Sequence, residues 1–125
     1  MSIIISHTTA KLPRGRFAAV ASTILGAQYQ LSLTFIGSTR ARTLNQTTRQ
    51  KDYVPNVLSF PLSRDAGEIY ICPEAAKKEA AGFGLSETGY LEYLCLHGCV
   101  HLLGHDHGKK MDALEATYKK QFSIK

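Results

Sequence analysis

Four of the five histidines lie in one stretch, LHGCVHLLGHDHG (96–108), and three of them follow the spacing H-x3-H-x5-H: His97, His101 and His107. Two histidines four positions apart on a helix stand one turn apart on the same face, so both imidazoles can bind one ion. Three neutral nitrogens without cysteine leave a fourth position open, which is typical of catalytic zinc. The spacing therefore predicts a metal site for zinc first, with nickel, copper or iron as further candidates.

Two glycines accompany this pattern. Gly104 allows the chain to leave a helix in a left-handed conformation, so that His107 can turn back toward the same ion. Gly98 falls in the middle of the expected helix, where glycine costs about 1 kcal/mol relative to alanine. This cost indicates a packing reason, namely a close approach of the helix to a sheet. Asp106 is expected to hold the loop or a ligand's second ring nitrogen, or to be an ordinary turn residue, and His105 to lie on the rim.

The first two histidines need a helix, and the surrounding sequence predicts one. Ser86 is a suitable N-cap, and Glu87 in the first turn faces the positive end of the helix dipole. We expect this helix to continue to Leu103. Its other face carries a stripe of small and apolar residues at helical spacing, suited to packing on a sheet: Leu91, Leu94, Cys95, Gly98 and Leu102.

The rest of the chain alternates between strand and helix patterns. Strands are expected at residues 2–6, 30–37, 57–60 and 67–72, and further helices at 14–26, 38–44, 73–82 and 111–122. The polar segment 45–55 has no periodicity and is predicted to be a loop. We therefore predict one small α+β domain over residues 1–125, with a mixed sheet of about four strands packed with helices. The zinc site would lie on a helix and the following loop, as in metzincins.

The composition is that of a globular domain, with 125 residues, 44% hydrophobic and 20% charged. No apolar run is long enough to span a membrane, and the first residues lack the pattern of a signal peptide. Three cysteines, an odd number, predict reduced thiols in a cytoplasmic protein, with Cys95 and Cys99 as small core residues. The net charge of +5 is compatible with nucleic acid, although the basic residues form only small clusters.

Two blocks of the chain together resemble the motifs of one known family. LHGCVHLLGHDHG is similar to HGxLHLxGYDH, and LNQTTRQKDYVPNVLSFP (44–61) is similar to LNxxYRxxDxxTDVLSFP. Both motifs are those of the bacterial YbeY family, the metal-dependent endoribonucleases of ribosomal RNA maturation. GEIYIC follows where that family has a GDI-type strand, and the resemblance extends from about Leu31 to the last helix. Metzincin proteases share the histidine spacing, but they carry a glutamate base where this chain has Gly98.

The resemblance implies roles for individual residues. It makes His97, His101 and His107 the ligands of one zinc ion per chain, and Arg49 the functional arginine of the LNxxYR element. It also implies that the strand beside the metal cleft contains Leu58, Ser59 and Phe60. The chain departs from the family pattern where Thr48 and His105 replace tyrosines and where Pro55-Asn56 replaces Thr-Asp. These departures affect expected substrate contacts, whereas the metal ligands are all present.

The resemblance implies a zinc-dependent, single-strand-specific endoribonuclease of the cytoplasm, acting in 16S rRNA 3′-end maturation and ribosome quality control. Its expected partners are an rRNA precursor and the ribosome or ribosomal proteins, with no DNA and no membrane. Arg49 and the three histidines, His97, His101 and His107, are the candidate catalytic residues, because a guanidinium can hold a phosphate bidentately and zinc can polarise it. The nucleophile is either a water activated by zinc or the RNA 2′-OH.

Two other functions remain open at this point. A metalloprotease-like hydrolase would keep the zinc spacing and need a base from elsewhere, such as Glu68 or Glu74. A non-catalytic ribosome-assembly factor would use the metal only to brace the C-terminal helices. The positive charge and Gly98 favour the RNA-linked functions over the protease.

Overall fold

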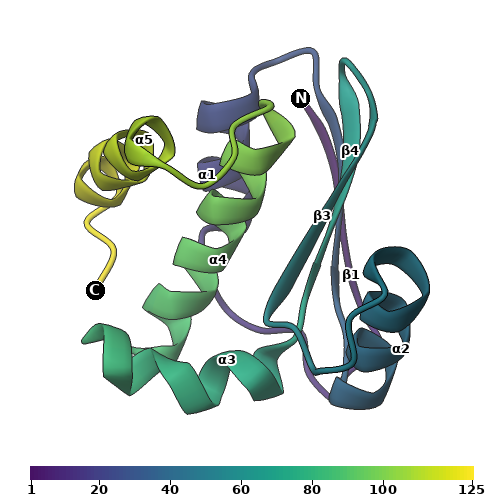
Figure 1. The fold of residues 1–125 in the computed structure, drawn as a ribbon. Helices are drawn as coiled ribbons and strands as arrows, with labels where there is room; N and C mark the ends of the chain where they lie inside the picture. The colour runs from purple at the N-terminus through teal and green to yellow at the C-terminus, as the bar shows by residue number, and fades with distance from the viewer.

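A four-stranded mixed sheet forms the centre of the computed structural model, which describes residues 1–125 (Figure 1). The strands are β1 (Ser2–His7), β2 (Gln30–Phe35), β3 (Val57–Ser63) and β4 (Ala66–Ile71), in the spatial order β1-β2-β4-β3. The strands β1, β2 and β4 run parallel, and β3 pairs antiparallel with β4. The predicted α+β fold with a mixed sheet is confirmed, and β3 is an edge strand.

Helices cover both faces of this sheet. They are α1 (Phe17–Leu25), α2 (Ser38–Arg49), α3 (Pro73–Ala80), α4 (Glu87–Leu102) and α5 (Lys109–Gln121), with a 3-10 turn η1 (Ala81–Phe83) after α3. Figure 1 shows α2 alone on one side of the sheet and α1, α4 and α5 on the other. No helix combines the length and the apolar character needed to cross a membrane.

The main hydrophobic core lies between the sheet and the helices α1 and α4. The alternating residues Leu31, Leu33 and Phe35 of β2 are buried there, as their pattern predicts. The face of α4 that was expected to pack on the sheet is buried too. Cys95 and Cys99 are buried free thiols, as expected of small core residues. The helix α4 is thus held along its length by apolar contacts, which gives the histidines a rigid support.

Gly98 is the point of closest approach between α4 and the sheet. A Cβ atom at this position would lie 2.8 Å from Ser59 Oγ on β3 and 3.0 Å from Ile69 Cδ1 on β4. The Ser59 hydroxyl also donates a hydrogen bond of 3.2 Å to the Gly98 carbonyl. The packing explanation for a glycine in mid-helix is therefore confirmed.

The helix α2 is longer than its sequence predicts. The polar segment 45–55 is predicted to be loop, but residues 45–49 are the last part of α2, which ends where Gln50 adopts a left-handed conformation with φ of 55°. Asn45 is fully buried, and its amide donates to the Tyr53 carbonyl at 3.1 Å. This contact joins a polar residue of the helix to a later segment, so no local apolar periodicity signals it. The helix therefore extends beyond its predicted end and places Arg49 in its last turn.

Candidate metal centre

Three histidines from α4 and the following loop converge on one point. His97 and His101 lie one turn apart on α4, and His107 lies in the loop before α5. Their candidate ligand atoms all lie within 4.8 Å of one another. Gly104, with φ of +95°, provides the left-handed turn that brings His107 back toward the helix. The structure thus brings the predicted ligand residues together in the predicted way.

The second ring nitrogens of the two helical histidines are engaged by acceptors. The Nδ1–H of His97 donates to the Glu115 carboxylate on α5, and the Nδ1–H of His101 donates to the His105 carbonyl at 2.9 Å. A carboxylate and a carbonyl can only accept, so both rings carry their proton on Nδ1 and leave the Nε2 lone pair free. Asp106 accepts from neither of these Nδ1–H groups, so the expectation that it holds the second ring nitrogen of a ligand is wrong for His97 and His101.

Glu115 is a further residue in contact with the candidate site, and the sequence did not predict it. Glu115 is 7% exposed, and its carboxylate also accepts a hydrogen bond of 2.8 Å from the Tyr93 hydroxyl. Burial acts to raise the pKa of Glu115, but the hydrogen bonds from His97 and Tyr93 outweigh it and hold this pKa below its ordinary value. The helical position of Glu115 gives a weak signal, because it is a carboxylate on the buried side of an otherwise polar helix.

These donors fit a divalent transition-metal ion. Three imidazoles offer Nε2 nitrogens, and the rings on α4 have the proton arrangement that a ligand needs. Burial and the neighbouring His97 lower the pKa of His101, which favours its neutral form. The group of three histidines can therefore hold a metal ion.

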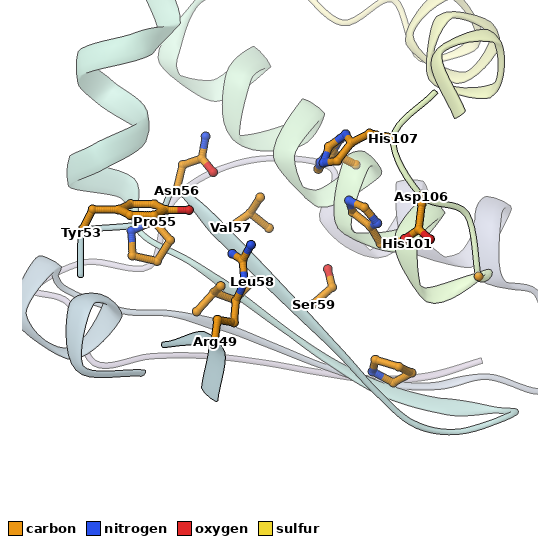
Figure 2. A pocket seen from close by; sticks show the side chains of 13 residues that line it. Arg49, Tyr53, Pro55, Asn56, Val57, Leu58, Ser59, His101, Asp106 and His107 are labelled. Atoms are coloured by element: carbon orange, nitrogen blue, oxygen red, sulfur yellow. The ribbon is translucent and has the colours of Figure 1, made fainter. Parts of the chain in front are cut away.

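The histidines open into a cleft of about 760 Å³ (Figure 2). Its lining comes from the end of α2, the segment leading into β3, β3 itself, and the α4–α5 connection: Arg49, Tyr53, Pro55, Asn56, Val57, Leu58, Ser59, Pro61, His97, His101, Gly104, Asp106 and His107. The strand β3, which contains Leu58, Ser59 and Phe60, lies beside the cleft as expected, and Leu58 and Ser59 line it. Glu68 and Glu74, the bases suggested for a protease, do not line the cleft.

Arg49 reaches this cleft from α2, on the other side of the sheet, past the edge strand β3. Two other arginines are paired with carboxylates, Arg16 with Glu92 at 2.9 Å and Arg42 with Asp52 at 2.7 Å. Arg49 makes no ion pair or side-chain hydrogen bond, so its guanidinium donors face the cleft unused. The unpaired guanidinium of Arg49 and a metal ion held by the histidines can bind the same anion.

The tyrosines of α4 near the histidines are packing residues. Tyr90 is buried and donates to Glu79 at 3.0 Å, and burial raises its pKa to about 12. Tyr93 is half-buried between Tyr90 and His97, and its hydroxyl is held by Glu115. Neither lines the cleft, so they support the site from behind.

The fold and the site together define a class of protein: a small α+β domain with a candidate three-histidine metal centre in an open cleft. Comparison with known proteins then gives the family. The family described as Endoribonuclease YbeY matches residues 3–124. The chain belongs to this family, as its two motif blocks indicated.

Curated relatives agree with this assignment, and a solved structure shows the same fold. "Endoribonuclease YbeY" of Pseudomonas syringae pv. tomato is 36% identical over 104 residues, covering 73% of this chain and 63% of the relative. The protein of the same name from Stutzerimonas stutzeri is 37% identical over 99 residues, covering 69% and 62%. The chain thus spans somewhat less than two thirds of these relatives. The solution structure of TM1509 from Thermotoga maritima has the same fold, with a TM-score of 0.66, 23% identity, and coverage of 97% of this chain and 91% of that one.

Proposed function

We propose that residues 1–125 form one hydrolase domain that acts as a zinc-dependent endoribonuclease on single-stranded RNA. The observation that best supports this is the presence of the three histidines and the unpaired Arg49 in one cleft. The only carboxylate lining the cleft is that of Asp106, on an exposed loop. A cleft with one free cation and a metal centre suits a polyanion better than a peptide.

Each side chain has a distinct role in this proposal. His97, His101 and His107 would hold one Zn²⁺, which when bound supplies Lewis acidity to a phosphoryl oxygen. Arg49 would bind the same phosphate through two parallel N–H donors and so orient it. Ser59 is the one serine that lines the cleft, and its hydroxyl donates to the Gly98 carbonyl, while no cysteine or lysine lines the cleft. The attacking group in this proposal is therefore water or the RNA 2′-OH.

The substrate proposed is the 3′ region of a 16S rRNA precursor, with a role in ribosome quality control in the cytoplasm. The family description and the names of the relatives support the endoribonuclease activity. The net charge of +5 supports an RNA or ribosomal partner, and we expect neither DNA nor a membrane to be one.

The test compares wild type with His101→Ala, each with measured zinc content, on a fluorescent single-stranded RNA and a DNA of the same sequence. His7→Ala is the matched control, because His7 is an exposed histidine on β1 outside the cleft. We expect wild type and His7→Ala to carry one zinc per chain and to cut the RNA alone. His101→Ala should remain folded, lose zinc and not cut.

Other outcomes would favour the two alternatives. Equal cutting by all three proteins, or cutting by none, would favour the non-catalytic assembly factor. Casein cleavage by wild type that a chelator abolishes would favour the protease-like hydrolase. That enzyme would have to use Asp106 as its base, because Glu68 and Glu74 lie outside the cleft.

A further inference from the structure

Tyr53 is the one aromatic side chain other than the histidines that lines the cleft, and it is 51% exposed. It makes no aromatic pair, and its hydroxyl makes no hydrogen bond, unlike Tyr90 and Tyr93 of α4. The ring thus offers an apolar face to the cleft without serving the packing of the fold. A large exposed aromatic without an internal partner is typical of a contact residue.

The backbone around Tyr53 is fixed although its ring is free. The buried Asn45 donates to the Tyr53 carbonyl at 3.1 Å. The neighbouring Asp52 carboxylate accepts hydrogen bonds of 2.7 Å from both Arg42 and Gln46 of α2. Because the backbone is already fixed, only the rotation of the Tyr53 side chain is restricted when a ligand stacks on its ring, which limits the loss of conformational entropy.

The position of Tyr53 relative to the other cleft residues suggests what stacks there. In the view of Figure 2, Arg49 lies between Tyr53 and the histidines. A cation and an exposed aromatic ring that line the same cleft match the alternation of phosphate and base along a single-stranded nucleic acid, where bases stack on aromatic side chains. The alternative ligand, a peptide along the edge of β3, would leave the Arg49 guanidinium without an anion.

Thr48 provides a second observation. The family motif has a tyrosine before the arginine, but here the Thr48 hydroxyl donates back to the Leu44 carbonyl at 2.6 Å, and Thr48 does not line the cleft. The aromatic residue of this region is instead Tyr53, four positions beyond Arg49, at a place where the motif specifies no residue type.

We propose that Tyr53 is a stacking platform for a base of single-stranded RNA, next to the phosphate that Arg49 binds. This inference rests on the proposed function, since it takes RNA as the ligand of the cleft. Stacking on one face is tolerant of sequence but favours large bases, so the platform prefers adenine over uracil. Tyr53 would therefore set base preference and affinity, whereas the histidines and Arg49 act on the phosphate.

The test measures binding of a short fluorescent 2′-O-methyl oligoadenylate to the zinc-loaded protein by anisotropy, because the methyl group removes the 2′-OH nucleophile. A second oligomer has the same backbone with abasic residues. The variants are Tyr53→Ala, Tyr53→Phe and, as a control, Phe83→Ala, an exposed aromatic of η1 outside the cleft.

We expect Tyr53→Ala to bind oligoadenylate about tenfold more weakly, as for the loss of one stacked base. Tyr53→Phe and Phe83→Ala should bind like wild type, and all four proteins should bind the abasic oligomer equally. The inference is overturned if Tyr53→Ala binds oligoadenylate as well as wild type does, or if it loses the same affinity for both oligomers.

The same experiment separates this inference from the proposed function. If wild type binds oligoadenylate but cuts no RNA in the cleavage assay, only the proposed activity fails, and the affinities still decide the role of Tyr53. If wild type binds no RNA, both are overturned.

Discussion

Glu115 on α5 accepts a hydrogen bond from the Nδ1–H of His97 on α4, and this bond joins the C-terminal helix directly to the candidate metal centre. The other carboxylate oxygen of Glu115 is held by the Tyr93 hydroxyl. The His97 ring is therefore oriented by a buried acceptor that is itself fixed in place. This arrangement links the docking of α5 to the geometry of a metal ligand.

Replacing Glu115 should weaken metal binding without any need for RNA. Partners of this kind change metal affinity by about 10- to 100-fold, so we expect such a loss of zinc affinity in Glu115→Ala. Glu115→Gln should recover part of it, because the amide oxygen still accepts from His97. Competition with a zinc indicator measures the affinity, and Asp112→Ala, on the same helix and exposed, is the control. Unchanged zinc affinity in Glu115→Ala would show that the contact does not orient His97.

Gly98→Ala should destabilise the fold although alanine is the better helix former. The new methyl group would meet Ser59 Oγ and Ile69 Cδ1 at 3.0 Å or less, and overpacking of this kind costs about 1–3 kcal/mol. Urea unfolding should show a lower free energy of unfolding. Gly82→Ala is the control, since no atom lies within 4 Å of its Cβ position. If Gly98→Ala were as stable as wild type, the close approach would not explain the glycine.

Arg49→Lys should reduce RNA cleavage while keeping the positive charge. Lysine lacks the paired, planar donors of arginine, and loss of one such contact to a reacting group lowers the rate about 100-fold or more. The value of kcat/KM on single-stranded RNA measures this. Arg40→Lys, on the same helix but outside the cleft, should cleave like wild type. Full activity in Arg49→Lys would mean that a point charge suffices at this position.

The ion pair between Arg16 and Glu92 should make the free energy of unfolding depend on pH. Hydrogen bonding by Arg16 lowers the pKa of Glu92, against the opposing effect of burial. A carboxyl group with a lowered folded-state pKa stabilises the fold above its unfolded-state pKa, and this contribution is lost as the pH falls through the folded-state pKa. Glu92→Gln should therefore lower the urea midpoint at neutral pH, and its difference from wild type should shrink as the pH falls through the folded-state pKa of Glu92. A difference in urea midpoint that stays the same from neutral to acidic pH would exclude the charge as the cause.

The sequence alone was sufficient for the features that depend on near neighbours. The spacing of His97 and His101 predicts their common face because the helical repeat is local, and Gly104 predicts the turn to His107. The alternation in β2 predicts its buried side for the same reason. The motif blocks around Arg49 and the histidines predict the family, which the comparisons confirm.

The tertiary structure decided what depends on contacts between distant segments. Asn45 of α2 is buried and its amide donates to the Tyr53 carbonyl, a contact with a later segment that accompanies the helical structure of residues 45–49, which have no apolar periodicity. Glu115 joins His97, and Arg49 and Tyr53 enter the cleft, only because α5 docks on α4 and α2 ends beside β3. Local sequence patterns do not predict such contacts, because the packing of the whole chain determines which distant side chains lie next to each other.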